Sequence, residues 1–105
     1  MTEPVSIEVP GLGRIELSNN TGAGQYELRV EGDLVGLATY RQHDGITVLP
    51  HTETAPAFGG RGLAARLVGF GLDDIRAHGG KVEPACPYVR DFIAKHPEYQ
   101  DLLAG

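Results

Sequence analysis

The spacing of hydrophobic residues changes at Pro56, and this change constrains the fold more than any other feature of the chain. Before Pro56, apolar and polar residues alternate in short runs, as they do in strands that bury one face. After it, apolar or small residues recur every three or four positions, which is typical of helices with one buried face. An antiparallel sheet covered by helices satisfies both patterns. The sequence therefore predicts an α+β fold with two main helices on a mostly antiparallel sheet.

Turn residues divide the first half into short predicted strands. The alternating runs cover residues 7–9, 14–17, 26–30, 34–40 and 46–49, with Gly, Pro, Asn or Asp between them. Because these connections are short, consecutive strands should pair antiparallel. Pro50 has no N–H to donate, so the continuation of the last strand through residues 51–54 should bulge or lie partly unpaired there.

Two helical stripes and a short strand follow. The first stripe runs from Leu63 to Ile75 and ends at the glycines after His78, which suit a helix C-cap. Residues 82–85 form a short predicted strand, and Pro87 suits the first position of a second helix that ends at Pro97. The tail 98–103 is predicted to add one helical turn that docks Leu102 and Leu103.

Length and charge restrict the class of protein. The 105 residues fit a single domain, and a net charge of −5 argues against broad binding to nucleic acid or to an anionic membrane. No apolar run approaches the length of a bilayer span. We expect a cytoplasmic monomer or weak dimer. Asp73, Asp74 and His78 share one helix without a cysteine or second histidine nearby, so we interpret them as a solvated face and predict no metal site.

A glycine-rich loop separates the last strand of the sheet from the first helix. It runs from Phe58 through Gly59, Gly60, Arg61 and Gly62 to Leu63 and Ala64. Glycines allow a ligand to approach the backbone, and the first N–H groups of a helix have no internal partner. Together with the helix dipole and Arg61, they favour a phosphate or pyrophosphate. The pattern lacks the Gly-Lys-Ser/Thr ending of a P-loop and the parallel unit of a dinucleotide-binding fold. A tight turn without any ligand is the alternative interpretation.

Four ordered blocks of sequence resemble the GNAT superfamily of acetyltransferases, and in particular a group of very small members with a Pro-x-Cys-Pro motif. The blocks are His51-Thr52-Glu53, Gly60-Arg61-Gly62-Leu63-Ala64, Pro84 to Val89, and His96-Pro97-Glu98-Tyr99. The resemblance covers residues 26–103, and residues 1–24 are then an N-terminal extension that adds a strand or hairpin. The chain departs from the superfamily pattern at Gly59, where a glutamine or arginine is usual.

The resemblance implies a sheet that splays before the glycine loop and admits coenzyme A into the gap. The residues then expected to bind acetyl-CoA, the cosubstrate, are Thr52, Thr54, Gly59, Gly60, Arg61, Gly62, Leu63, Ala64, Cys86 and Tyr88.

Cys86 is the only thiol and stands just before the helix that begins at Pro87. Unpaired N–H groups at a helix N-terminus lower the pKa of a thiol and make it a better nucleophile. The alternative is a small buried core residue, which is the usual place of a free cysteine. With the resemblance, Cys86 lies near the reactive end of the cofactor, where an acyl-cysteine intermediate is one open route.

Four further side chains are candidates for proton transfer. Glu53 and His51 lie two residues apart on a strand and therefore point to one face, where either can deprotonate an amine. The alternatives are a solvated charge for Glu53 and a backbone-bonded strand-end histidine for His51. By analogy with the superfamily, Tyr99 or Tyr88 would protonate the leaving thiolate, although aromatic residues at such positions often pack the core.

Three functions follow from these observations. The first is a small N-acetyltransferase that passes an acetyl group from acetyl-CoA to an amine, either directly or through Cys86. Its acceptor would be an exposed amine, such as a protein side chain or a polyamine. The second is a non-catalytic acyl-CoA sensor or interaction module, which Gly59 favours. The third is an interaction domain without a cofactor.

Overall fold

A six-stranded sheet forms the body of the protein, and its strands follow one another in chain order. The computed structural model describes residues 3–104, so the first two residues of the predicted N-terminal extension and Gly105 lie outside it. The first four strand pairs are antiparallel, and the last pair is parallel. The strands are β1 Val5–Val9, β2 Gly13–Asn20, β3 Gln25–Val30, β4 Asp33–His43, β5 Ile46–Thr54 and β6 Lys81–Glu83.

Two-residue turns fix the register of the central strands. Glu31-Gly32 joins β3 to β4 and Asp44-Gly45 joins β4 to β5, with positive φ at all four residues. Turns of this kind match the right-handed twist of the strands they connect, and the glycine in each adopts positive φ without steric cost. The mostly antiparallel sheet predicted from the sequence is therefore confirmed.

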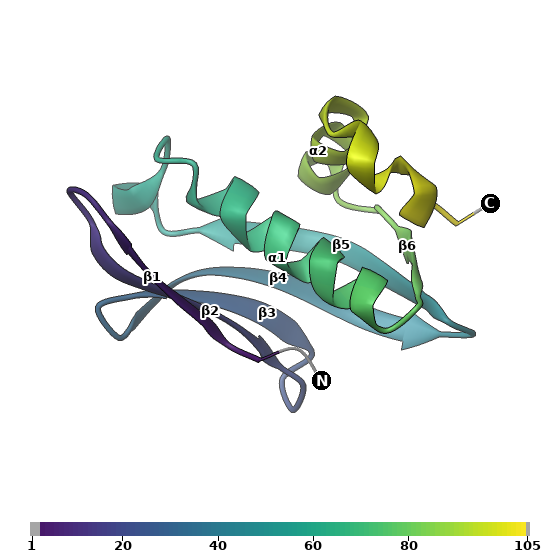
Figure 1. Cartoon of the computed structure of the whole chain (residues 1–105), viewed down its shortest axis with the longest axis horizontal. Helices are drawn as coiled ribbons and strands as arrows, with labels where there is room; N and C mark the ends of the chain where they lie inside the picture. Colours follow the sequence, from purple (N-terminus) through teal and green to yellow (C-terminus); the bar gives the residue numbers. More distant parts are fainter. Residues whose placement is uncertain (1–2, 105) are drawn as a thin grey trace.

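Two helices cover one face of this sheet, as predicted. Helix α1 spans Leu63–Ala77 and packs across β3, β4 and β5, while α2 spans Pro87–Lys95 and contacts both α1 and β5 (Figure 1). Short 3-10 helices precede α1 at Pro56–Phe58 (η1) and follow α2 at Pro97–Leu102 (η2). No helix within residues 3–104 combines the length and the apolar character that a bilayer span requires.

The hydrophobic core lies between the sheet and the helices. It joins buried residues of the five strands β2 to β6 to both helical stripes. Its least exposed members are Ile15, Tyr26, Leu28, Leu67, Leu72, Val82, Val89 and Ile93. The spacing selects seven apolar or small residues in α1, and all of them are buried except Ala64, which is half-buried: Leu63, Ala64, Leu67, Val68, Gly71, Leu72 and Ile75. The predicted period of α1 is therefore confirmed.

Three local predictions were wrong. Strand β6 ends at Glu83 and not at Ala85, because Pro84 stops the ladder and the Ala85 N–H turns back to the Glu83 carbonyl. Leu103 is 41% exposed, since the turn that buries Leu102 ends there and Leu103 bridges Val82 through its backbone.

The third correction concerns Asp74, which is 4% exposed and not part of a solvated face. The Tyr26 hydroxyl donates to Asp74 Oδ2 at 2.8 Å, and Asn19 Nδ2 donates to the same oxygen at 3.2 Å. The buried side of α1 therefore includes a carboxylate that the apolar stripe did not reveal. Polar partners from β2 and β3 compensate for its removal from water.

Candidate functional site

The glycine loop leads directly into the N-terminus of α1. After η1, the chain passes through Gly59 to Gly62, and Leu63 is the first helical residue. Gly62 is the N-cap with φ of 75°, and Gly60 has φ of 74°. No side chain caps α1, so its first N–H groups remain open to a ligand. The left-handed conformation at both positions explains why the sequence has glycine there.

A row of backbone N–H groups lacks partners at this point. The N–H groups of Phe58 and Gly59 bond back to Ala55 and Pro56, and the first bond into the helix runs from Arg66 to the Gly62 carbonyl at 3.2 Å. Between them, the N–H groups of residues 60–65 make no hydrogen bond to any residue in 3–104. Such a row, together with the positive end of the helix dipole, suits an anion.

A hollow of about 230 Å³ lies over this loop. It is lined by the loop residues Phe58, Gly59, Gly60, Gly62, Leu63 and Ala64, and by Thr54 and Tyr88. A Cβ atom at Gly60 or Gly62 would meet nothing within 4 Å, so the backbone faces open space there. The structure thus brings together Thr54 of β5, the glycine loop and Tyr88 of α2.

One arginine lies within the loop and a second follows it. Arg61 and Arg66 are both exposed, and the ion pairs of residues 3–104 involve other cations. The Arg66 amide lies one helical turn from Gly62. Arg61 is one of the predicted site residues and Arg66 is not, although a basic residue four positions after Gly62 returns to the same side of a helix. Both side chains are free to meet a polyanion in a chain whose net charge is −5.

The sheet opens between β5 and β6 next to this hollow. The two strands pair only from Ile46 to Val48, and one further bond joins the Cys86 N–H to the Leu49 carbonyl at 2.8 Å. Beyond Leu49 the chain of β6 has turned into α2, so within residues 3–104 no strand covers that edge of β5. Pro50 falls in the register shift between β4 and β5, as the sequence predicted.

Cys86 stands at the corner where β6 gives way to α2. The residue is the N-cap of α2 and is 6% exposed, and its Sγ lies 3.5 Å from Thr52 Oγ1. Burial alone would raise the pKa of the Cys86 thiol, but hydrogen bonds from Thr52 and from the amides of Val89 and Tyr88 outweigh it, so the pKa is lowered. Cys86 is therefore a core residue whose thiol pKa lies below the ordinary value.

The side chains of His51 and Glu53 contact each other on the opposite face of β5. Their Nε2 and Oε2 atoms are 3.1 Å apart, and the side chains are 57% and 62% exposed. Since strand residues alternate, this face is the one turned away from Thr52 and Thr54. A hollow of about 220 Å³ adjoins Glu53 and is lined largely by apolar residues, among them Leu34, Leu37 and Pro56. His51 and Glu53 thus lie on the opposite side of β5 from the thiol.

The family model for GCN5-related N-acetyl-transferase matches residues 25–102. The match covers the splayed strand, the glycine loop, Cys86 and the C-terminal turn. The chain belongs to the GCN5-related N-acetyltransferase family. Members of this family use acetyl-CoA as cosubstrate. The match begins at the first residue of β3 and does not include β1 or β2, which pair as a hairpin at the edge of the sheet.

Solved structures share the fold of this GCN5-related protein. A GCN5-like protein from Staphylococcus aureus is 22% identical and aligns with a TM-score of 0.67 over 92% of each chain. The ribosomal-protein-S18-alanine N-acetyltransferase from Escherichia coli is 13% identical with a TM-score of 0.58, covering 68% of this chain and 49% of that one. A GNAT-family protein from Desulfovibrio desulfuricans is 21% identical, with a TM-score of 0.54 and coverages of 68% and 52%. No curated protein matches the sequence.

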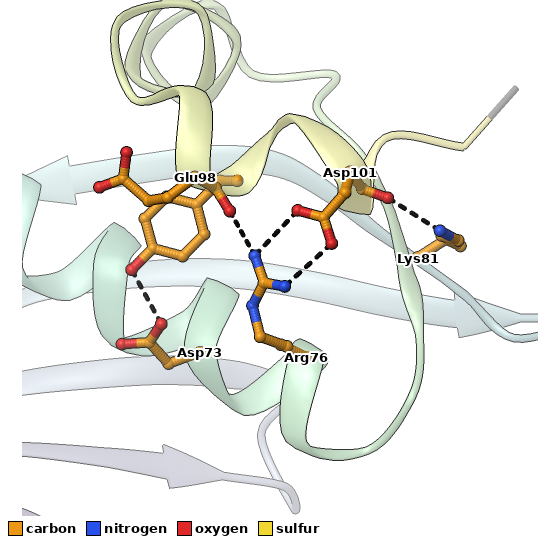
Figure 2. Close-up of polar contacts among 6 residues, drawn as sticks. Asp73, Arg76, Lys81, Glu98 and Asp101 are labelled. Carbon is orange, nitrogen blue, oxygen red and sulfur yellow. Dashed lines mark hydrogen bonds and ion pairs between the residues drawn. The ribbon is translucent and has the colours of Figure 1, made fainter.

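Tyr99 does not lie near Cys86. Its hydroxyl donates to Asp73 Oδ1 on α1 at 2.8 Å, and burial together with Asp73 raises the pKa of Tyr99 to about 12. Figure 2 shows the surrounding contacts, in which Arg76 bonds both oxygens of Asp101 and the Glu98 carbonyl. Tyr99 thus helps to hold η2 on α1, and within residues 3–104 its hydroxyl bonds to neither Cys86 nor Glu53.

Tyr88 lies closer to the candidate cofactor site than Tyr99 does. It lines the hollow over the glycine loop and is 41% exposed. Burial raises the pKa of the Tyr88 phenol, and Asp91 raises it further, so the phenol keeps its proton at neutral pH. Of the two tyrosines, Tyr88 is therefore the one placed to donate a proton beside the loop.

Proposed function

We propose that this protein binds acetyl-CoA across the glycine loop and the open edge of β5 and transfers the acetyl group to an amine. The observation that carries the proposal is the row of unpartnered N–H groups over residues 60–65, which faces the hollow beneath Tyr88. The pyrophosphate would accept hydrogen bonds from this row, with Arg61 and Arg66 adding charge. A P-loop or Rossmann site is excluded by the sequence pattern of the loop.

The pantetheine arm would lie along β5 in the gap left by β6. An amide-containing arm can pair with free backbone groups of a strand edge, as an added strand does. This path leads from Thr54 toward Thr52 and Cys86, because Thr52 and Thr54 share the face that carries the hollow and the thiol. The thioester would then arrive where the sheet splays, at the level of Leu49 and Pro50.

The acceptor amine would approach from the face of His51 and Glu53. Its nitrogen attacks the thioester carbonyl carbon, and Glu53, paired with His51, accepts the proton that the nitrogen loses. The carbon–sulfur bond then breaks, and the coenzyme A thiolate takes a proton from Tyr88 or from water. Because Glu53 is exposed, the acceptor can be an amine that projects from a protein or the end of a polyamine.

A route through Cys86 is the alternative for the same reaction. The Cys86 thiolate would attack the thioester, coenzyme A would leave as the thiolate, and the amine would take the acetyl group from Sγ in a second step. The lowered pKa of Cys86 supports this route. Mass spectrometry after mixing with acetyl-CoA tests it, since an acetyl adduct should form and should be absent in Cys86→Ala.

The decisive test of cofactor binding compares coenzyme A with pantetheine by isothermal titration calorimetry. We expect coenzyme A to bind at least about tenfold more tightly, because only it carries the pyrophosphate. Gly62→Glu should abolish this difference. Gly79→Glu is the matched control, since Gly79 also has positive φ and open space around its Cβ position but lies at the other end of α1. Equal affinity for the two ligands would overturn the phosphate assignment.

Gly59 favours a second function, a non-catalytic acyl-CoA sensor. The family pattern has a glutamine or arginine there, and Gly59 has no side chain with which to bind phosphate. Coenzyme A binding by the calorimetric test, combined with no acetyl adduct and no transfer to polyamines or lysine peptides, would select this second function. Absence of binding would leave an interaction domain without a cofactor.

A further inference from the structure

A third cavity lies beside the C-terminal half of α1, and its lining includes the buried carboxylate residue Asp74. The cavity has a volume of about 130 Å³. Its lining includes Tyr26, Gln42, Thr47, Asp74, Ile75 and His78, and none of its lining residues contributes to the hollow over the glycine loop. Asp74 and Thr47 are 4% and 3% exposed. Two polar side chains thus face a cavity that the proposed cofactor site does not use.

One oxygen of Asp74 lacks a hydrogen bond. Oδ2 accepts from Tyr26 and Asn19, whereas Oδ1 is the only buried side-chain oxygen or nitrogen in residues 3–104 without a partner. Buried polar atoms are normally paired, and an unpaired carboxylate oxygen is among the most costly exceptions. A hydrogen-bond donor from outside the chain would satisfy this oxygen.

His78 does not supply that donor. Its Nδ1 is 3.4 Å from Asp74 Oδ1 but only 2.8 Å from the backbone carbonyl oxygen of Asp74. A carbonyl oxygen can only accept, so the Nδ1 proton is assigned to the carbonyl. The ring therefore directs its N–H to the helix backbone, and Oδ1 remains a buried oxygen without a donor in a residue that lines the cavity.

Neutral hydrogen-bond acceptors line the same cavity as Asp74. Gln42 Nε2 donates to Thr47 Oγ1 at 3.3 Å, which leaves Gln42 Oε1 free and a second lone pair on Thr47. The lining also includes the ring of Tyr26 and the side chain of Ile75. The cavity thus offers one negative charge, several neutral oxygens and apolar neighbours. Such a lining suits a ligand with one positively charged hydrogen-bond donor and a short hydrocarbon chain.

We propose that this cavity binds the ammonium group of a small aliphatic amine. The three N–H donors of the ammonium would bond Asp74 Oδ1, Thr47 Oγ1 and Gln42 Oε1, and its short chain would lie against Tyr26 and Ile75. The volume corresponds to about four water-sized groups, which is the size of propylamine. The site is independent of the proposed function, because the two cavities share no residue.

Other classes of ligand fit less well. A divalent metal prefers several carboxylate or imidazole ligands, and no group of three or more such residues gathers anywhere between Glu3 and Ala104. An anion would be repelled by Asp74, and so would the carboxylate of an amino acid. A hydrated potassium ion shares the charge of an ammonium but gains nothing from Tyr26 and Ile75.

The test is an NMR titration of ¹⁵N-labelled protein with propylammonium chloride at constant ionic strength. Saturable shifts should centre on the amides of Gly45 and Gly80, which line the cavity, and on the Gln42 side chain. Asp74→Asn keeps the shape of the carboxylate without its charge and should weaken binding at least about tenfold. Asp73→Asn removes the same charge from the next, outward position of α1 and should leave the affinity unchanged.

A second variant keeps the binding test informative if Asp74→Asn does not fold. Thr47→Val preserves shape and leaves the contacts of Asp74 intact, and it should weaken binding at least about threefold. Propionate, which has the same size and the opposite charge, should not bind. The proposal is overturned if propylammonium gives no saturable shifts, if potassium chloride gives the same shifts, or if Asp73→Asn weakens binding as much as Asp74→Asn. Unchanged affinity in Thr47→Val would also overturn the assigned contacts.

Discussion

Thr52 Oγ1 lies 3.5 Å from Cys86 Sγ, so a strand residue and the N-cap of α2 meet across the point where β5 and β6 part. The contact connects two segments that are 34 residues apart in the sequence. It places the only thiol of the chain beside the open edge of β5, on the same face as the hollow over the glycine loop. The chemistry of Cys86 therefore depends on a neighbour that the local sequence does not reveal.

The first prediction concerns the ionisation of Cys86. Thr52→Val keeps the shape of residue 52 but removes the hydroxyl that lowers the pKa of the thiol, so the pKa of Cys86 should rise. The far-ultraviolet absorbance of the thiolate, followed as a function of pH, measures the pKa of Cys86. The Cys86→Ser variant gives the background absorbance of the protein without a thiol. Thr54→Val serves as the control because Thr54 lies two residues along the same face. A pKa that is unchanged in Thr52→Val would contradict the role of this contact.

The second prediction concerns the packing of α1 on β3. A Cβ atom at Gly71 would lie 2.9 Å from Tyr26 Cδ2, and the Tyr26 ring is 1% exposed between Tyr40 and Phe70. Gly71→Ala should therefore lower the free energy of unfolding by about 1–3 kcal/mol through overpacking. Urea denaturation measures this change.

Gly69→Ala is the matched control on the same helix. Its Cβ would meet only Phe92 and Tyr99, both at 3.9 Å, which is an ordinary contact. Alanine is also the better helix former, so this variant should gain about 0.5–1 kcal/mol. Equal effects of the two substitutions would show that the Tyr26 ring can move aside and that its close approach to Gly71 does not limit stability.

The third prediction concerns alkaline pH and Tyr99. The pKa of Tyr99 is raised from 10.0 to about 12 in the folded protein, chiefly by burial and by the bond to Asp73. In this range the unfolded chain releases a proton that the folded chain keeps, so the associated stability is present below pH 10 and is lost as the pH rises to about 12. Tyr99→Phe should lose stability less steeply than the parent over this interval. Identical slopes in urea denaturation would show that Asp73 does not hold the proton.

The fourth prediction concerns acetyl transfer and rests on the proposed function. Glu53→Gln should lower kcat by about 100-fold, the usual contribution of a general base, while the KM for acetyl-CoA stays constant. The assay uses radiolabelled acetyl-CoA and the best acceptor from a panel of polyamines and lysine peptides. Glu83→Gln removes the same charge from exposed β6 and should leave kcat unchanged. A normal kcat in Glu53→Gln would show that Glu53 is not the base.

The order and type of the elements could be predicted because they depend on local spacing. Alternation defined the strands, turn residues such as Asp44-Gly45 fixed their antiparallel order, and glycines marked both ends of α1. The two-residue spacing of His51 and Glu53 likewise placed both on one face, and the structure pairs them at 3.1 Å. Each of these features arises from residues that are close in the chain, which is why the sequence alone determined them.

Only the tertiary structure decided which distant side chains meet. Asp74 has the polar character of an exposed residue, but Tyr26 lies 48 positions away and holds it in the core. The family resemblance implies that Tyr99 lies near the reacting thiolate, whereas in the structure its hydroxyl donates a hydrogen bond to Asp73. The splay of β5 from β6 also depends on where α2 packs. These outcomes depend on the sum of burial and pairing over the whole molecule, and a local pattern carries no information about a partner on another element.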